Sequence, residues 1–306
     1  MEWEVGLIES LQGILGDSGS FIEKALSFFG DEKGLMVMIF IVMFCWKKET
    51  GQKLGLIISA TNAWLSMIKA VVLRPRPYME HPDRVKARTL VNTSAAPDDV
   101  AAQGYSFPSM HSASVPALYI TLAQEVKKKW MWITAIVLTV LVGLSRVTLG
   151  MHYPTDVLTG WILGFLIIGI FALLEKYIEK EWIRHLILLV SMLPGFFFVR
   201  THDYFTSLGA LIGIILAIHF ERKYVGYAIT DNKFAMVLRV VGAFLVYLVL
   251  NTILKLPFDK AFLDGETLGA LLVRTARYAV VMFVITGVYP KVFPFYEKIG
   301  KSRAQD

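Results

Sequence analysis

The chain alternates long apolar runs with short polar links from about residue 35 onward. A helix needs roughly 20 apolar residues to cross the hydrocarbon core of a bilayer. Residues 5–28 carry apolar side chains at helical spacing with acids between them, which is typical of an interfacial amphipathic helix or of an ordinary packed helix. The pattern therefore predicts an all-α, polytopic transmembrane helical bundle with about nine spans, the first one short, over residues 35–46, 54–73, 109–124, 131–147, 155–174, 183–199, 205–220, 234–254 and 267–289.

The composition supports this prediction. The 306 residues are 55% apolar, and their mean hydropathy of +0.55 is too high for an ordinary soluble domain. The acidic N-terminal stretch, with Glu2, Glu4 and Glu9, lacks the basic start of a signal peptide, so no removable signal is expected. The single cysteine, Cys45, excludes an intrachain disulfide and a cysteine metal cluster, and its apolar neighbours predict a packed thiol.

The basic residues of the connecting links predict the orientation of the helices. If nine spans alternate, the basic stretches 47–53, 127–129, 222–233 and 291–303 share one side, which the positive-inside rule assigns to the cytoplasm. The C-terminus is then cytoplasmic, and a plasma (cytoplasmic) membrane is the expected location. These links explain the net charge of +6 without a nucleic-acid partner.

Three groups of polar residues lie at the ends of apolar runs, all on the expected extracytoplasmic or lumenal side. Charged side chains are costly at such positions, which favours a function for them. The groups are Lys69 with Arg76 and Pro77; Pro108, Ser109, Met110 and His111; and Ser145, Arg146, His152 and Asp156.

Each group has an ordinary explanation when it is taken alone. Lys69 could be a lysine whose side chain extends to the membrane interface. Ser109 could be an ordinary helix N-cap, and Asp156 could be an acid that is favoured near a helix start. Taken together, the groups suggest an anion site. A helix start at Ser109 offers N–H groups to phosphate oxygens, and a carboxylate such as Asp156 orients an imidazole such as His152.

The spacing of these groups resembles that of the type 2 phosphatidic acid phosphatase, or lipid phosphate phosphatase, superfamily. That family has lysine, six residues, arginine and proline; then proline-serine-glycine-histidine; then serine-arginine, five residues, histidine, three residues and aspartate. The first and third motifs match at every specified position. Met110 replaces the usual glycine of the second motif, which narrows the pocket but leaves a backbone N–H for phosphate.

The resemblance covers roughly residues 35–175 and suggests three regions: an N-terminal segment 1–34, a phosphatase core 35–175 and additional C-terminal helices 176–306. It implies hydrolysis of a lipid phosphate or diphosphate through a phosphohistidine, without metal or cofactor. His152 would attack phosphorus, oriented by Asp156, and His111 would protonate the leaving group. The implied phosphate-binding residues are Lys69, Arg76, Ser109, Met110 and Arg146.

Several alternatives remain open at this level. The substrate class includes isoprenyl diphosphates such as undecaprenyl diphosphate, glycerolipid phosphates and sphingoid phosphates. The competing functions are a lipid phosphotransferase that uses the same histidines and a non-enzymatic lipid or anion transporter. Asp98 and Asp99 lack a metal-ligand pattern, so solvated charges or a helix cap are expected. No oligomeric state is predicted.

Two further regions carry noteworthy charge. The loop 74–107 has the mixed charge of a solvated loop, with a lid or headgroup collar as the alternative. Arg239, Arg274 and Arg277 lie in or near apolar runs, where an arginine needs a partner or an interface. Contacts between helices, or extension to the interface, are favoured over a second anion site.

Overall fold

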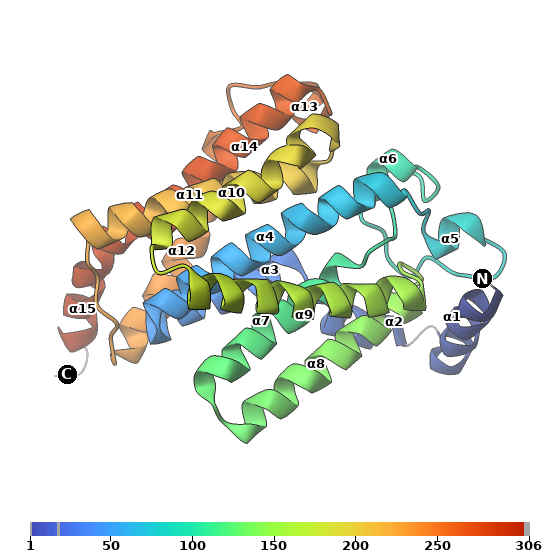
Figure 1. Ribbon diagram of the computed structural model, residues 1–306, viewed down its shortest axis with the longest axis horizontal. Coiled ribbons are helices and arrows are strands. Elements are labelled where there is room, and N and C mark those ends of the chain that lie inside the picture. Colours follow the sequence, from blue (N-terminus) through green and yellow to red (C-terminus); the bar gives the residue numbers. More distant parts are fainter. Residues whose placement is uncertain (1, 17–18, 303–306) are drawn as a thin grey trace. The chain divides into compact units, whose positions relative to one another are not determined.

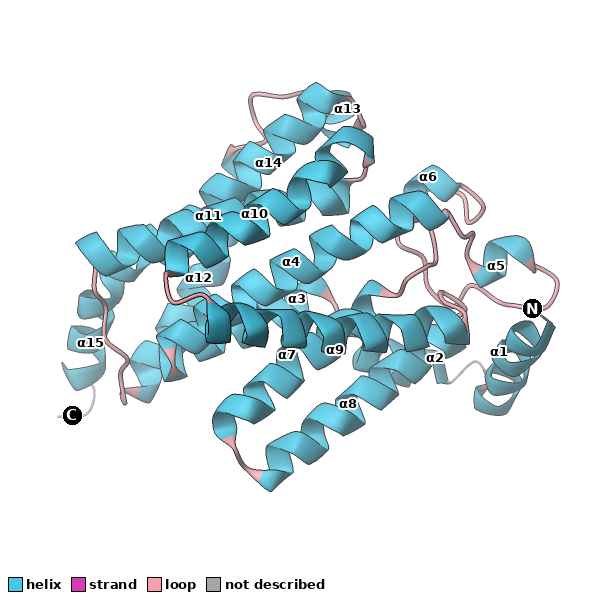
Figure 2. Cartoon of the chain, viewed as in Figure 1, coloured by secondary structure: helices cyan, strands magenta, loops and turns pink. Residues whose placement is uncertain are grey.

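The computed structural model describes residues 2–16 and 19–302, and all regular elements in these ranges are helices (Figure 1). Figure 2 shows these helices joined by loops, with a long loop between α5 and α6. The elements are α1 (Glu2–Leu15), α2 (Gly19–Ser27), α3 (Glu32–Ile41), the π-helical turn η1 (Val42–Trp46), α4 (Lys48–Val72), α5 (Pro77–Glu80), α6 (Val100–Gln103), α7 (Met110–Val126), α8 (Lys129–Thr148), α9 (Pro154–Tyr177), α10 (Glu181–Phe198), α11 (His202–Tyr224), α12 (Lys233–Ile253), α13 (Lys260–Asp264), α14 (Leu268–Phe283), η2 (Val284–Val288), η3 (Tyr289–Val292) and α15 (Phe293–Ser302).

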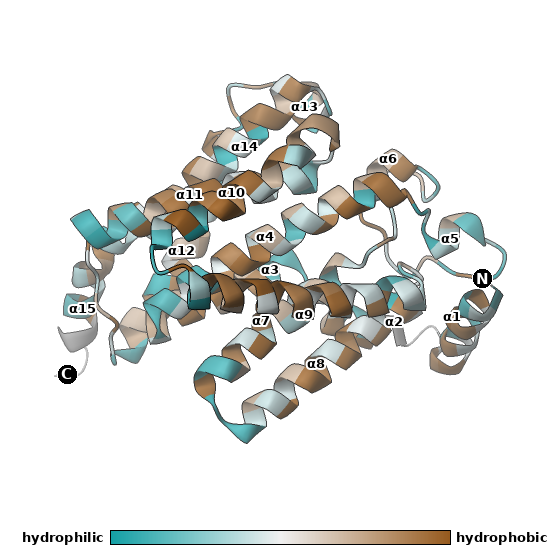
Figure 3. Cartoon of the chain, in the orientation of Figure 1, coloured by the Kyte–Doolittle hydropathy of each residue, from teal (hydrophilic) through white to brown (hydrophobic). Residues whose placement is uncertain are grey.

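Seven helical segments of the described chain are long and apolar enough to cross a membrane: Lys48–Glu80, Lys129–Thr148, Pro154–Tyr177, Glu181–Phe198, His202–Tyr224, Lys233–Ile253 and Leu268–Ile299. The two other expected spans form shorter helices: α7 has 17 residues, and the helix formed by α3 and η1 ends at Trp46. The predicted fold class is confirmed, with nine an approximate count. Figure 3 shows the pattern that produces it, with apolar residues along α9 and hydrophilic residues at the turn between α7 and α8.

The chain forms two compact units. Unit 1 contains Met1–Leu35 and Met67–Leu174, and unit 2 contains Met36–Ser66 and Glu175–Asp306. Helix α4 begins in unit 2 and ends in unit 1, so its last residues, including Lys69, belong to the same unit as the other two motifs.

In unit 1, α7 and α8 form an antiparallel hairpin, and α9 packs closely against α7. The hairpin turns at Lys127, whose φ of 55° is left-handed. Gly160 and Gly164, one turn apart on α9, allow the close approach: a side chain at Gly160 would place its first carbon 2.7 Å from the carbonyl oxygen of Ser109. Small residues at this spacing are typical of packed membrane helices. Because α9 lies so near, the start of α7 and the start of α9 meet.

In unit 2, α11 and α14 make the most extensive helix pair and run parallel. Gly209 and Gly213 of α11 lie against the backbone of α14 at Thr275 and Ala279, again at a four-residue spacing. At the C-terminal end of α11, Glu221 accepts a hydrogen bond from Lys48 at 3.1 Å. This contact brings the start of α4 and the end of α11 together.

Arg239 of α12 is buried and makes the contact between helices that the sequence favours. Its guanidinium donates to Glu297 of α15 at 2.9 Å and to the carbonyl oxygens of Phe44 and Ala228 at 3.0 Å each. Three of the four basic stretches expected on the cytoplasmic side, those around residues 47–53, 222–233 and 291–303, therefore meet at one end of unit 2.

Candidate active site

The end of α4 and the residues after it place the two cations of the first motif. Leu73, with a φ of 52°, ends the helix, and Arg76 is the extended N-cap of α5. Lys69 Nζ donates to the carbonyl oxygen of Tyr105 at 2.6 Å. Arg76 donates to the carbonyl oxygen of Gln103 at 2.8 Å and to that of Met151, the neighbour of His152, at 3.1 Å. Arg76 thus lies outside the helix and joins the first motif to the third.

The second motif forms the N-terminus of α7, as predicted. Ser109 is the N-cap, and its hydroxyl accepts a hydrogen bond from the backbone N–H of Ser112 at 3.4 Å. The backbone N–H of Ser109 donates to the carbonyl oxygen of Asp156 at 3.1 Å. A helix start leaves the N–H groups of Met110 and His111 without acceptors inside the helix. Met110 is helical, so the glycine usual at this position is not required for the backbone geometry.

The third motif brings His152 and Asp156 together at the start of α9. The helix begins at Pro154, so His152 lies just before it and Asp156 in its first turn. The distance from His152 Nδ1 to Asp156 Oδ2 is 3.7 Å. This is an ion-pair separation and exceeds hydrogen-bond length, and His152 Nδ1 is buried without a hydrogen-bond partner among the described residues.

The carboxylate of Asp156 is fully buried and held from three sides. Oδ2 accepts hydrogen bonds from the hydroxyl of Ser106 and, at 2.8 Å, from the backbone N–H of Tyr153. Oδ1 accepts from Arg74 Nη1 at 2.8 Å. These contacts fix the carboxylate beside His152. Nothing in the local sequence pairs Ser106 or Arg74 with Asp156, and both were missed, although Arg74 lies only two residues before the motif arginine.

His111 has a carboxylate of its own, which sequence reasoning also missed. Its Nε2 lies 2.5 Å from Asp31 Oδ1, in the link between α2 and α3. Burial opposes ionisation of Asp31, but the hydrogen bond and charge of His111 outweigh it and keep the pKa of Asp31 below its usual value. The only sequence signal is that Asp31 is an acid just before an apolar run.

Arg146 lies near both histidines. Its Nη1 donates to the hydroxyl of Ser27 at 2.9 Å, and its carbonyl oxygen accepts from the backbone N–H of His152 at 3.2 Å. The charges of Arg76 and Arg146 act on both His111 and His152. The two imidazoles therefore lie within electrostatic range of the same two guanidinium groups.

The N-terminal helices pack directly against this site. Glu4 of α1 is fully buried, and its carboxylate accepts from Arg74 at 2.9 Å and from the hydroxyl of Thr155 at 2.6 Å. Glu23 of α2 pairs with Arg88 of the long loop at 2.8 Å. Helices α1 and α2 are thus packed against the rest of unit 1, and the loop 74–107 is tied to them; an interfacial position of these helices stays a prediction.

The charges around His152 determine its protonation. Burial lowers the pKa of His152 well below its usual value, and the positive charges of Arg76, Arg146 and Lys69 lower it further, whereas Asp156 raises it. The imidazole is therefore neutral at neutral pH.

One acid of the long loop caps a helix. Asp99 is the N-cap of α6, and its carboxylate accepts from the backbone N–H of Ala101 at 3.0 Å, which confirms the helix-cap interpretation for that residue. Within residues 2–16 and 19–302, no three His, Cys, Asp or Glu side chains gather as a metal-binding group.

Comparisons with known proteins agree with the motif geometry. Residues 51–180 match the model of the PAP2 superfamily, and residues 205–300 match that of the PAP2 superfamily phosphatase, transmembrane extension. The phosphatidylglycerophosphatase B of Bacillus subtilis is 33% identical over 156 residues, 48% of this chain and 67% of that protein. The undecaprenyl-diphosphatase of Sulfolobus acidocaldarius is 48% identical over 60 residues, 20% of this chain and 29% of that protein.

A third relative is the decaprenylphosphoryl-5-phosphoribose phosphatase of Mycolicibacterium smegmatis, 38% identical over 94 residues, 31% of this chain and 43% of that protein. The chain thus spans less than a third of the Sulfolobus protein and less than half of the Mycolicibacterium one. No solved structure matches the chain. The two family matches and the long alignment with the Bacillus protein show that this integral membrane protein belongs to the PAP2 superfamily.

Proposed function

We propose that the protein is a membrane phosphatase that hydrolyses a lipid phosphate or diphosphate through a phosphohistidine, without metal. The observation that carries the proposal is the arrangement of His111 and His152, each beside a carboxylate, around the shared guanidinium groups of Arg76 and Arg146. Two imidazoles around one cationic centre suit the transfer of a phosphoryl group to one of them and of a proton from the other.

In the first step, His152 Nε2 attacks phosphorus and the bond to the lipid oxygen breaks. Nδ1–H faces Asp156, which stabilises the developing positive charge on the ring. Protonated His111 has two N–H groups; it donates one to Asp31 and the other to the departing oxygen, which leaves as an alcohol or, from a diphosphate, as a lipid monophosphate.

In the second step, a water molecule attacks phosphorus and the bond to His152 breaks. Neutral His111 takes the proton of that water, and inorganic phosphate leaves. Lys69, Arg76 and Arg146 balance the charge on the phosphoryl oxygens, together with the hydroxyl of Ser109 and the N–H groups at the start of α7, including that of Met110. Positive side chains and helix amides thus provide the electrostatic stabilisation, and no metal is required.

The substrate class rests on the membrane setting and on the relatives. The motif residues lie at the ends of apolar helices, where a headgroup can enter while its tail stays in the bilayer. The similar proteins are named for undecaprenyl diphosphate, phosphatidylglycerophosphate and decaprenylphosphoryl-phosphoribose. We expect an isoprenyl diphosphate or a glycerolipid phosphate to be the best substrate, with sphingoid phosphates as a further candidate.

The test is a phosphate-release assay on the purified full-length protein in EDTA, with isoprenyl, glycerol and sphingoid phosphates. Wild type should release phosphate, and His152→Ala should lower turnover by about 10³-fold or more because it removes the nucleophile. Substrate binding should survive, since the cations remain. Labelled substrate should leave a phosphorylated His152 after rapid acid-free quenching.

Three outcomes would overturn the proposal. A His152→Ala variant that keeps full lipid flux would indicate a transporter. A phosphorylated acceptor in place of free phosphate would indicate a phosphotransferase. Loss of turnover in EDTA, with recovery on adding a divalent metal, would contradict the metal-free mechanism.

We also propose that the site faces the extracytoplasmic or lumenal side of a plasma membrane and that the C-terminus is cytoplasmic. The basic stretches 47–53, 222–233 and 291–303 meet at one end of unit 2, as the positive-inside rule requires of cytoplasmic links. The functional regions 1–34, 35–175 and 176–306 remain part of this proposal.

A further inference from the structure

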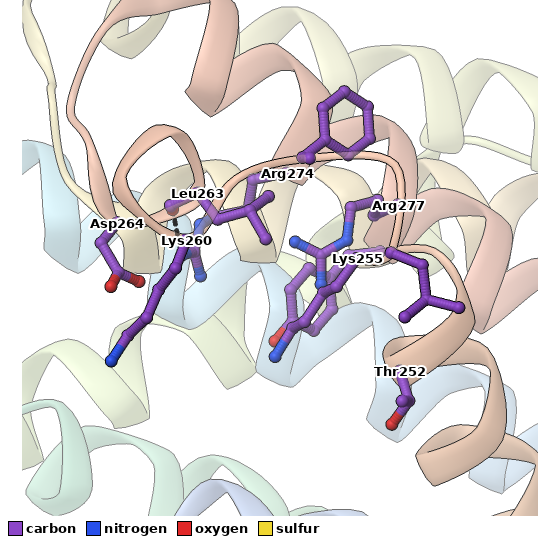
Figure 4. A pocket seen from close by; sticks show the side chains of 10 residues that line it. Thr252, Lys255, Lys260, Leu263, Asp264, Arg274 and Arg277 are labelled. Atoms are coloured by element: carbon purple, nitrogen blue, oxygen red, sulfur yellow. Dashed lines mark hydrogen bonds between the residues drawn. The ribbon is translucent and has the colours of Figure 1, made fainter.

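A pocket lies in unit 2 between the end of α12 and the middle of α14, with α13 closing one side (Figure 4). Its volume is about 480 Å³, within the range of small-ligand sites. The lining is Thr252, Lys255, Leu256, Phe258, Lys260, Leu263, Asp264, Arg274, Arg277 and Tyr278. All of these residues belong to the region that matches the transmembrane extension, which the proposed catalytic mechanism does not use.

The charge of the lining is strongly unbalanced. Four cationic side chains, Lys255, Lys260, Arg274 and Arg277, face one carboxylate, Asp264. Within the described parts of the chain, no carboxylate lies within ion-pair distance of any of the four. Buried Arg239, by contrast, is matched by Glu297. The four positive charges of the lining therefore exceed the single negative charge of Asp264 that faces them.

Two arginines of α14 are fixed in place by neutral groups. Arg277 is only 6% exposed; its Nη2 donates to the Asn251 side chain at 3.0 Å, while its buried Nε has no hydrogen-bond partner in the described chain. Arg274 donates to the carbonyl oxygen of Leu263 at 3.3 Å. Neutral acceptors orient the guanidinium groups but leave their charge uncompensated, and a buried cation is costly unless a counter-charge is supplied.

Lys255 and Lys260 come from the link that crosses over the pocket, and both are exposed. Figure 4 shows Lys255 extending beside Arg277, with Lys260 on the other side of the pocket. Burial lowers the pKa of Lys255, and the charges of Arg277 and Arg274 lower it further. An anion placed among these groups would relieve that repulsion.

The pocket lies at one end of the helices of unit 2. His202, at the start of α11, contacts the carbonyl oxygen of Gly265 at 3.4 Å, just before α14 begins. Glu221, near the end of α11, binds Lys48 of α4, so the pocket lies toward the opposite end of α11. This position corresponds to a membrane surface, where phosphate-bearing headgroups are found.

We propose that this pocket is a second anion site, separate from the histidine site, which binds a phosphate or phosphate-ester group through Lys255, Lys260, Arg274 and Arg277. Arginine binds phosphate oxygens with two parallel N–H donors, and lysine acts as a mobile point charge. The group is either the headgroup of an anionic lipid or free inorganic phosphate.

The test is equilibrium binding to the purified full-length protein in neutral detergent, counted by native mass spectrometry. One arm uses a short-chain phosphonate analogue of phosphatidic acid, which the protein cannot hydrolyse, and the other uses inorganic phosphate. Wild type should bind two equivalents of at least one probe. In Lys255→Gln/Lys260→Gln, one equivalent should bind at least about tenfold more weakly because two charge-assisted contacts are lost.

The matched control is Lys223→Gln/Lys298→Gln, which removes the same charge from exposed lysines of unit 2 outside the pocket; it should bind like wild type. Loss in the lipid arm alone identifies a lipid headgroup, loss in the phosphate arm alone identifies free phosphate, and loss in both identifies the phosphate group itself. If the pocket variant binds both probes as wild type does, the proposal is wrong.

This test is independent of the catalytic proposal. The pocket variant should keep its phosphate-release rate in detergent within about twofold, since none of its substitutions touches the histidine site. Arg277→Lys, which retains charge but loses the two-pronged donor, should weaken binding less than the double variant. Binding that is insensitive to added salt in wild type would also contradict a charge-based site.

Discussion

At His152, burial and three nearby cations act against one carboxylate, and the balance keeps the imidazole neutral. The contact with Asp156 is 3.7 Å long, and the carboxylate is already held by Arg74 and Ser106. Catalytic hydrogen bonds are often long without substrate and shorten in the complex. A bound phosphoryl group neutralises the surrounding cations, which oppose a positive charge on His152. We therefore expect the ring to become more positive and to move closer to Asp156 when this group is bound.

The first prediction concerns the pH dependence of kcat/KM. Burial, Arg76, Arg146 and Lys69 lower the pKa of His152, so activity should persist below pH 6.5, the ordinary histidine value. Removing a cation makes the imidazolium easier to form, which raises the pKa. Lys69→Met should therefore move the acid limb of the pH profile to higher pH, whereas Lys86→Met, which removes an exposed charge from the long loop, should leave it in place. A shift of the limb to lower pH would contradict this account.

The second prediction concerns Asp31, which acts through His111. Asp31→Asn should lower kcat by about 10- to 100-fold with little change in KM, because the proton donor loses its orienting carboxylate. A substrate whose leaving group needs no proton, such as a p-nitrophenyl phosphate ester, should lose much less activity. Asp83→Asn, an exposed carboxylate in the same unit, is the control.

A merely structural role for Asp31 would have a different signature. Both kinds of substrate would then lose activity equally, and the melting temperature would fall in parallel.

At the scale of elements, α1 packs against the candidate active site and supports it. It supplies Glu4, which is buried against Arg74 and Thr155, and it packs Val5 and Ile8 into an apolar cluster with Tyr153 and Val157. The exposed side of the same helix bears Glu2 and Glu9, which pair with Arg84 of the long loop. The same helix therefore carries both a buried and an exposed ion pair.

The third prediction uses this contrast. Glu4→Gln leaves Arg74 with one buried carboxylate fewer, which should cost about 3 kcal/mol of stability and lower activity, because Arg74 also holds Asp156. Glu9→Gln on the same helix removes an exposed partner and should leave the melting temperature nearly unchanged. Thermal unfolding in detergent and turnover measure the two effects. Equal losses in the two variants would show that α1 does not support the site through Glu4.

At the scale of the whole molecule, the turns and termini of the helices determine which side each loop faces. In unit 1, α7 leaves the site end at Ser109, turns at Lys127 and returns as α8 to Arg146. The long loop around Ser94 lies at the site end, because Ser106 and Arg74 flank it and bind Asp156. Ser94 and Lys128 should therefore lie on opposite sides of the membrane.

The fourth prediction follows from that separation. In a Cys45→Ala background, Ser94→Cys should react with a membrane-impermeant maleimide in intact cells, whereas Lys128→Cys should react only after the membrane is opened. From the positive-inside rule, we expect the turn with the basic residues around Lys128 to face the cytoplasm. The reverse labelling pattern would invert the orientation and put the active site in the cytoplasm.

Hydropathy and motif spacing were enough to predict the all-helical fold, most of the spans and Ser109 as an N-cap. These features depend on local properties: the length of an apolar run and the capping preference of serine. Hydropathy placed the short helices at 35–46 and 109–124, and the described helices there extend by one to three residues further, over 32–46 and 110–126, still below full spanning length. Local signals are weakest at such boundaries.

The partners of the catalytic residues came only from the folded chain. Asp31 lies 80 residues from His111, and Arg74 lies 70 residues from Glu4 and 82 from Asp156. A hydrogen bond between such distant positions cannot be predicted from the periodicity or the motif spacing of a single sequence. It depends on close helix packing, as at Gly160 on Ser109, which brings the ends of several helices together. The basic pocket at α12 and α14 arises in the same way, since neutral acceptors and four cations meet only after the helices have packed.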